Sequence, residues 1–145
     1  MSIFTNGEIT LELVSTVPGN PAKNWILAQH YLIQKTSTNE PVGQIDLRLG
    51  YTLDLVRYGG NIGYSIQQAF RGHHYAAKAC LLLKPVAQQY GMDVLWITCN
   101  PDNLPSRKTC EYIGATLVEI VDLPEYSDMY QEDERQKCRY RWIIY

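Results

Sequence analysis

The chain has 145 residues, a length typical of one domain that can bury its own hydrophobic core. Hydrophobic residues make up 46% of the sequence and charged residues 19%, which is the composition of an ordinary globular protein. The formal net charge is −2 and the lysines and arginines are scattered, which argues against nucleic-acid binding and against a polybasic membrane-binding patch. Residues 1–7 lack a signal-peptide pattern and no apolar run could span a membrane, so we expect one cytoplasmic domain over residues 1–145.

The four cysteines, Cys80, Cys99, Cys110 and Cys138, are widely spaced and form no CxxC pair. Such pairs are typical of zinc sites and redox-active dithiols. In a chain without an export signal we therefore expect reduced thiols, most of them buried in the core.

The first half of the chain is predicted to form strands separated by turns. Apolar-rich or alternating segments bounded by turn formers predict strands at Ile9–Val14, Trp25–Gln34, Val42–Leu49 and Asn61–Ile66. The connection between the first two strands is short and rich in glycine and proline, so we expect no long helix there.

In the second half of the chain, the hydrophobic pattern changes its period. Good helix formers predict a helix over Tyr75–Tyr90, closed by Gly91 and kinked at Pro85. A second helix is expected after Asn103, with Pro105 near its start and Gly114 just past its end. Three further strands are predicted at Val94–Cys99, which reads as buried on both faces, at Ala115–Val121 and at Cys138–Tyr145. The expected fold class is α/β (α+β), with a mixed, largely antiparallel sheet of about seven strands flanked by helices.

A long polar segment, Asp122–Lys137, separates the last two predicted strands. Segments of this length in a compact domain are usually functional or mobile. This one is acidic and contains interleaved tyrosines, a composition that suits holding a cationic amine. A solvated surface loop would have the same composition, so both interpretations stay open.

The junction between the fourth strand and the first helix contains a single glycine, Gly72, within Arg71–Ala76. Unpaired backbone amides and the positive end of the helix dipole stabilise phosphate groups at such a helix start. Many strand-loop-helix junctions contain glycine without binding a ligand, so this feature alone indicates little.

A second feature follows at a matching distance, with Asn103 and Ser106 before a helix that ends in Gly114-Ala115. Together the two features resemble the GNAT superfamily of acyl-CoA N-acetyltransferases. The signature of that superfamily is Arg or Gln, two residues, Gly, one residue, then Gly or Ala, followed by an Asn-x-x-Ser/Ala turn and a helix ending in Gly-Phe. Arg71 and Ala76 match its outer positions, and the resemblance extends over residues 42–145.

The resemblance implies acetyl-CoA as cosubstrate, no metal, and acetyl transfer to a primary amine. The residues it assigns to CoA binding are Ile66, Arg71, Gly72, His73, His74, Tyr75, Ala76, Asn103 and Ser106. The acceptor would be a small amine, an amino sugar or a protein amine. We expect no nucleic-acid or membrane partner, and a homodimer is one way to complete the site.

Two departures from the family pattern affect these expectations. His74 occupies a position where the family has glycine, and histidine is among the better-tolerated residues at positive φ. The helices that usually form a wall of the acceptor site are missing, so that side is expected to be open, or closed by the late polar segment or by a second subunit.

The resemblance also implies direct attack of the amine within a ternary complex, without an acyl-enzyme. A backbone amide near Ile66 would polarise the thioester carbonyl. We expect Asp128 to accept the proton of the amine and Tyr130 to line the acceptor site. Many family members place a tyrosine four residues before the helix-end glycine as general acid. That position is Cys110 here, and Tyr112 would point to nearly the opposite face of the helix.

Three alternatives compete with this function. A degenerate member would bind acyl-CoA as a sensor or scaffold without turnover. A sugar-phosphate or nucleotide enzyme is disfavoured, because the loop lacks the GxxxxGK[ST] and GxGxxG patterns. A zinc site at His73, His74 and Cys80 is also disfavoured, because adjacent residues at a helix start point about 100° apart.

Overall fold

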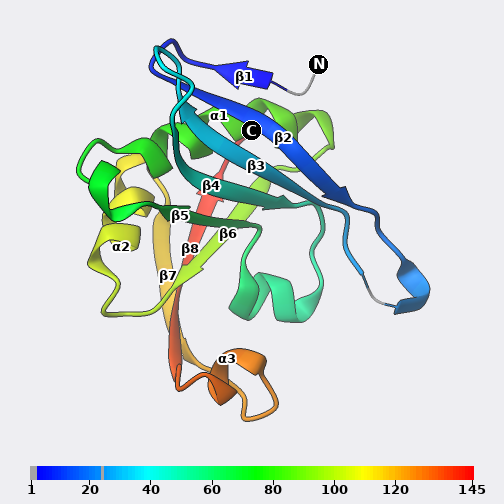
Figure 1. Cartoon of the computed structure of the whole chain (residues 1–145). Helices are drawn as coiled ribbons and strands as arrows, with labels where there is room; N and C mark the ends of the chain where they lie inside the picture. The colour runs from blue at the N-terminus through cyan, green and yellow to red at the C-terminus, as the bar shows by residue number, and fades with distance from the viewer. Residues whose placement is uncertain (1–2, 24) are drawn as a thin grey trace.

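The structure, a computed structural model, describes residues 3–23 and 25–145, and these residues form eight strands and three α-helices (Figure 1). The strands are β1 (Ile3–Thr5), β2 (Ile9–Val17), β3 (Ala28–Lys35), β4 (Pro41–Arg48), β5 (Ile62–Ile66), β6 (Val94–Cys99), β7 (Thr116–Asp122) and β8 (Gln136–Ile143). The helices are α1 (Tyr75–Gln89), α2 (Leu104–Tyr112) and α3 (Asp128–Gln131). Short 3₁₀ turns occur at Pro21–Lys23 and Gln68–Phe70, and a π-helical turn occurs at Leu55–Gly59.

All eight strands belong to one sheet in the order β1-β2-β3-β4-β5-β6-β8-β7. Neighbouring strands are antiparallel, except that β5 and β6 run parallel and are joined through α1. A parallel pair needs such a crossover connection. The predicted fold class is therefore confirmed, with β1 as an additional strand at one edge of the sheet.

The two faces of the sheet are covered differently. The helix α1 packs against β2, β4 and β5, and α2 packs against β6 and α1. Apolar residues at alternate strand positions are buried on this face, among them Ile45, Leu47, Leu95 and Ile97. The opposite face is partly covered by the π-helical turn, where the hydroxyl of Thr98 on β6 donates to the carbonyl of Tyr58 over 2.7 Å. Figure 1 shows α1 behind the sheet and this turn in the connection between β4 and β5.

The parallel strands β5 and β6 meet only briefly. Among the described residues they pair at Ile62 and Ile97. Just before this point the Asn61 amide donates to the Trp96 carbonyl over 2.6 Å, and the Trp96 amide donates back to Asn61 Oδ1 over 2.8 Å. Beyond Ile62 the strands separate and leave an opening in the sheet between Gly63–Ile66 and the end of β6.

Several predicted elements need correction. Trp25 lies outside β3, which starts at Ala28, because the chain first closes a turn in which Asn20 and Trp25 form an isolated bridge. The prediction that Val94–Cys99 is buried on both faces is wrong, because residues 94, 96 and 98 stay partly exposed on the face without helices. The long polar segment, expected as a loop, contains a short helix, α3, whereas Pro85 lies within α1 as predicted.

No helix within residues 3–23 and 25–145 is both long and apolar enough to cross a membrane.

Candidate functional site

The loop between β5 and α1 turns through two left-handed residues. Gly72 has φ +93°, and a Cβ atom built there would meet no atom within 4 Å. His74 has φ 59° and ψ 28° and stands immediately before the first residue of α1. The prediction that histidine takes the conformation usually given to glycine is confirmed at His74.

The first turn of α1 offers unpaired backbone amides. The side chain of His74 makes no capping hydrogen bond to this turn. The first amides of a helix have no intrahelical acceptor, so those of Tyr75 and Ala76 are available to an anion. Arg71 lies beside these amides. A hydrogen bond of 3.1 Å from its Nε to the carbonyl of Ile66 holds its side chain there.

The two histidines point to different neighbours. The ring of His73 stacks on Tyr75 with 5.2 Å between centroids, and the ring of His74 stacks on Tyr112 at 4.4 Å. Tyr112 is 51% exposed while Cys110 is buried, so the two residues do lie on different faces of α2. Within the described part of the chain, no group of three or more metal-ligating side chains is close enough to hold an ion.

A cleft of about 670 Å³ lies between the end of β5, this loop and the starts of α1 and α2. The structure brings most of the predicted CoA-binding residues to its wall, namely Ile66, Arg71, Gly72, His74, Tyr75, Ala76, Asn103 and Ser106. His73 is outside this set because its ring turns toward Tyr75. Two sequence-distant segments, residues 64–76 and 103–109, therefore form one cleft.

The α2 side of the cleft is held by a helix cap. Asn103 is the N-cap of α2, and its Oδ1 accepts the Ser106 amide over 3.2 Å. Ser106 is only 8% exposed. Because an N-cap satisfies one orphan amide of the helix, Asn103 has a structural role as well as its place in the cleft wall.

Tyr64 is a residue of the cleft that the sequence did not single out. Its hydroxyl oxygen lies 2.7 Å from Ser106 Oγ and 4.0 Å from Cys110 Sγ. The phenol thus bridges the opening from β5 to α2 on the face that the helices cover. Burial raises the pKa of Tyr64 well above its usual value, so the hydroxyl keeps its proton over the physiological range. Alternation along β5 places Tyr64 on the same face of the sheet as Ile62 and Ile66. This pattern could have identified Tyr64 as a residue of that face.

The backbone of β5 presents amides to the opening. The Arg48 amide donates to the Asn61 carbonyl, and the Gln67 amide donates to the Val42 carbonyl. In an antiparallel pair, successive residues of a strand direct their backbone groups to opposite sides. The amides of Tyr64 and Ile66 therefore point away from β4, toward the opening.

Cys110, the predicted general acid, lies in the core. Its side chain is fully buried, and burial raises the pKa of its thiol to about 12. A thiol with so high a pKa stays protonated at neutral pH and does not take part in acid–base exchange with solvent. All four cysteines are free and buried, as predicted.

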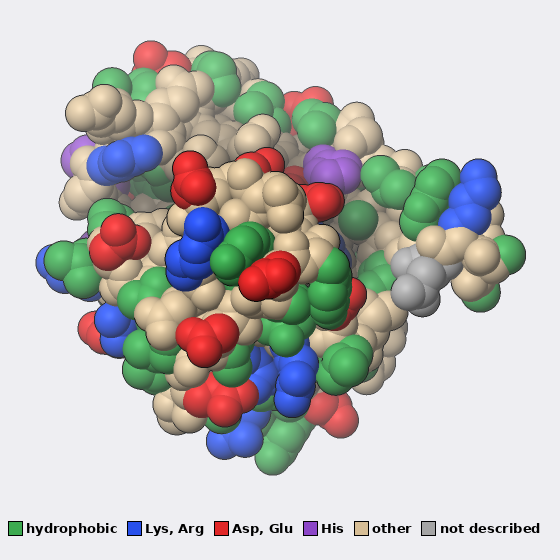
Figure 2. Space-filling model, turned by 90° about the horizontal axis from the view of Figure 1, so that it is seen from below, with side chains coloured by type: hydrophobic (Ala, Val, Ile, Leu, Met, Phe, Trp, Pro, Cys, Tyr) green, Lys and Arg blue, Asp and Glu red, His purple; other side chains and the backbone are tan. Residues whose placement is uncertain are grey.

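The late polar segment borders a second cleft of about 700 Å³, and Asp128 lines it. Figure 2 shows acidic side chains interspersed with Lys and Arg on this face of the molecule, and a hollow beside them. Tyr130 is absent from the described lining. Its ring instead lies under the Arg135 guanidinium, 4.0 Å from the ring centroid. Tyr126 lines the cleft in its place and donates to Asp54 over 2.9 Å.

Comparison with known proteins agrees with this geometry. The sequence matches the family of acetyltransferase (GNAT) domains over residues 12–116, which is most of the chain. The chain belongs to the GNAT acetyltransferase family. No match was found among curated proteins by sequence comparison.

Solved structures of GNAT proteins share the fold. The acetyltransferase from Bacillus anthracis is 19% identical with a TM-score of 0.63, and the match covers 79% of this chain and 66% of that protein. The ribosomal-protein-S5-alanine acetyltransferase from Vibrio fischeri is 10% identical with a TM-score of 0.69, covering 98% and 96%. RimL, a ribosomal L7/L12 α-N-protein acetyltransferase solved with coenzyme A, is 16% identical with a TM-score of 0.67, covering 98% of both chains.

This GNAT chain differs from the family pattern between β2 and β3. The described residues there form only the 3₁₀ turn Pro21–Lys23, where the sequence predicted no long helix. Val17, Trp25 and Ile26, which flank this turn, line the second cleft opposite the late segment. Within the described residues, the late segment faces this turn across the second cleft, and its closure of the acceptor site stays a prediction.

Proposed function

We propose that this GNAT protein is an N-acetyltransferase that transfers the acetyl group of acetyl-CoA to a primary amine within a ternary complex. One observation carries the proposal: the opening between β5 and β6 joins a cleft walled by the free amides of α1 and by the capped turn of α2. RimL, which shares this fold and whose structure contains coenzyme A, is an α-N-protein acetyltransferase. Such relatives support an amine acceptor for this chain without identifying it.

The described residues fit CoA. The open space over Gly72 lets the chain backbone approach a pyrophosphate closely, and the start of α1 supplies amides with a positive dipole end. Arg71 adds a cation at the rim. When bound, acetyl-CoA supplies the activated acetyl group, and the chain contributes orientation, hydrogen bonds and proton transfer.

Three groups of the chain would act on the reacting atoms. The backbone amides of Tyr64 and Ile66 would donate to the carbonyl oxygen as negative charge develops on it. The hydroxyl of Tyr64 would donate to the sulfur as the carbon–sulfur bond breaks and its electron pair moves to sulfur. Asp128 would accept the proton that the amine nitrogen loses, directly or through water. Tyr64 thereby replaces Cys110 as the side chain that faces the leaving group.

Ligand-induced stabilisation tests the cofactor assignment. Because only the native loop presents the converging amides, CoA at 100 times its dissociation constant should stabilise the fold by about 2.7 kcal/mol. Release of free thiol from acetyl-CoA in the presence of amines, amino sugars and peptides then tests turnover. An unchanged melting temperature in millimolar CoA would refute the CoA site. CoA binding without thiol release in any reaction would instead favour an acyl-CoA-binding protein without turnover.

A further inference from the structure

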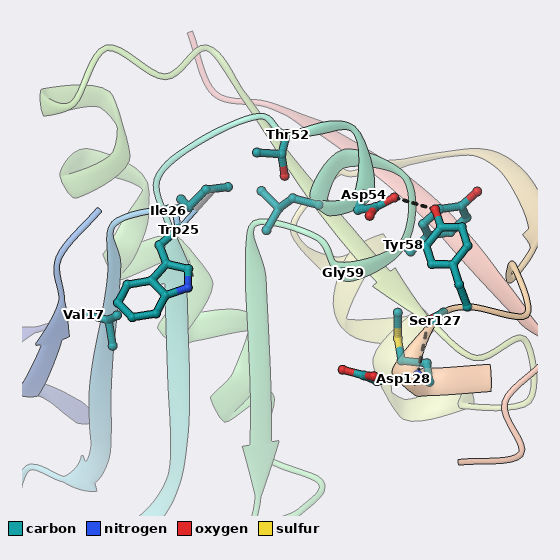
Figure 3. Close-up of a pocket in the computed structure, with 12 residues that line it drawn as sticks. Val17, Trp25, Ile26, Thr52, Asp54, Tyr58, Gly59, Ser127 and Asp128 are labelled. Carbon is teal, nitrogen blue, oxygen red and sulfur yellow. Dashed lines mark hydrogen bonds between the residues drawn. The ribbon is translucent and has the colours of Figure 1, made fainter. Parts of the chain in front are cut away.

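The second cleft lies where three connections of the chain meet (Figure 3). The turn between β2 and β3 forms one side, with Val17 and Trp25. The segment before β5, with Asp54, and the start of α3, with Asp128, form the other side. Figure 3 shows Trp25 and Val17 on one side of the pocket and Asp128 on the other.

The lining combines apolar surface with negative charge. Trp25, Ile26 and Met129 supply aromatic and aliphatic contacts, and Asp54 and Asp128 supply carboxylates. Trp25 is 52% exposed, so its ring has apolar surface left for a ligand to bury. One cation, the Lys23 ammonium, lies 4.7 Å from the centre of its ring, but Lys23 does not line the cleft. Such a mixture suits an organic cation with an apolar skeleton.

The cleft borders the π-helical turn that precedes the opening in the sheet. Tyr58 and Gly59 line it, and the Tyr58 carbonyl accepts the hydroxyl of Thr98 over 2.7 Å. Thr98 follows Ile97, the last β6 residue that pairs with β5. A ligand in this cleft therefore approaches the opening from the face opposite α1, while the CoA cleft approaches it from the helical face.

A hydrogen bond joins two walls of the cleft. Tyr126 donates to Asp54 over 2.9 Å and so joins the segment before α3 to the segment before β5. With this hydrogen bond in place, the cleft is open to solvent and has a volume of about 700 Å³. That space is within the range of about 300–1,000 Å³ that is usual for small-molecule sites.

We infer that this cleft binds the acceptor as a compact arylalkyl amine, with the ammonium group facing Asp128 and the aromatic group against Trp25. The inference rests on the proposed function, and it narrows the acceptor from any primary amine to an aromatic one. As the amine loses its proton to Asp128, its nitrogen can enter the opening and form the bond to the acetyl carbon.

Direct binding measurements test this assignment. Calorimetry with CoA present would compare 2-phenylethylamine, ethylamine and a short peptide beginning with serine. We expect 2-phenylethylamine to bind at least about tenfold more tightly than ethylamine, because its ring buries apolar surface.

Trp25→Ala should remove most of this preference. Asp128→Asn should weaken binding of both amines about 2- to 5-fold at low salt, since the carboxylate is exposed. Asp133→Asn, in the same acidic segment but outside the described lining, serves as the matched control.

The outcomes separate the inference from the proposed function. Equal binding of the two amines, preferred binding of the peptide, or binding unchanged in Trp25→Ala would overturn the inference, even if acetylation of another amine were observed. Failure of the proposed function would appear as no thiol release with any amine while CoA still binds. Tight 2-phenylethylamine binding that depends on Trp25 and Asp128 supports the cleft assignment in either case.

Discussion

The hydroxyl of Tyr64 on β5 lies 2.7 Å from the hydroxyl of Ser106 on α2, and this contact crosses the opening between β5 and β6. It places a phenol that keeps its proton in the wall of the proposed CoA cleft. A thioester that enters this cleft toward the opening must pass the Tyr64 hydroxyl. Tyr64 therefore has both a structural contact and a position suited to the leaving group.

Replacing Tyr64 with phenylalanine separates these two roles. We expect kcat to fall about 100-fold, because a hydrogen bond to developing charge is lost, while the dissociation constant of CoA changes little. Steady-state kinetics with saturating acetyl-CoA measure this effect. Tyr112→Phe, which removes a phenol on the other face of α2, should leave kcat unchanged.

A double variant provides the control for stability. Tyr64→Phe leaves the buried hydroxyl of Ser106 without this partner, at a cost of about 1–3 kcal/mol in the free energy of unfolding. Removing both hydroxyls in Tyr64→Phe/Ser106→Ala should restore part of that stability and none of the rate. If the double variant recovered both together, Tyr64 would have only a structural role.

Two glycines at opposite ends of α1 allow a matched test of the phosphate loop. Gly72 and Gly91 both have positive φ, +93° and +79°, and a Cβ atom at either would meet nothing within 4 Å. Valine at either position should destabilise the fold by at least about 1–2 kcal/mol, because a β-branched residue is strained there. Only Gly72→Val should also weaken CoA binding, by about 10- to 100-fold, through loss of an amide contact to phosphate. Equal CoA affinity in the two variants would place the pyrophosphate elsewhere.

Stability at high pH should depend on Cys110. Its pKa is raised to about 12 in the folded protein, whereas the unfolded thiol titrates near its ordinary value of about 8.5. Above that ordinary value the unfolded chain binds fewer protons than the folded one, so the free energy of unfolding decreases as pH rises. The slope contributed by one thiol approaches about 1.4 kcal/mol per pH unit below the folded pKa.

Denaturant unfolding between pH 7 and pH 11 would measure this slope. Cys110→Ala should lower stability at pH 7, because it leaves a small cavity, and should reduce the slope above pH 9 by the contribution of one proton. Cys80 and Cys99, whose pKa values burial also raises, account for part of the slope that remains. Parallel curves for the wild type and the variant would contradict a buried, titrating Cys110.

Much of the fold follows from local patterns. The strands β4, β5 and β6 and the helix α1 match their predicted ranges closely, because alternation and helix-forming runs are properties of neighbouring residues. The CoA loop is also predictable, since its motif combines a strand end, a glycine and a helix start. Local patterns fail for β1, a strand of three residues that exists through its pairing with β2.

The candidate site is less predictable in its side chains. Tyr64 and Trp25 carry no motif. Tyr64 contacts Ser106, far along the chain, and Trp25 shares a cleft with the distant late acidic segment. The composition of its segment points to Asp128, whereas Tyr130 of the same segment turns to Arg135 instead. Composition indicates the chemistry of a segment but not which side chains face a cleft.

By itself the sequence determined most of the order of strands and helices and the GNAT motif with its helix-start loop, because these depend on residues within a few positions of one another. Tertiary structure alone decided that β5 and β6 separate after Ile62, that Tyr64 reaches Ser106 across the opening, and that three connections enclose a second cleft. These features join residues far apart in the sequence, as Ile62 and Ile97 illustrate. Their geometry is set by how the sheet twists and how the helices pack, which no local pattern encodes.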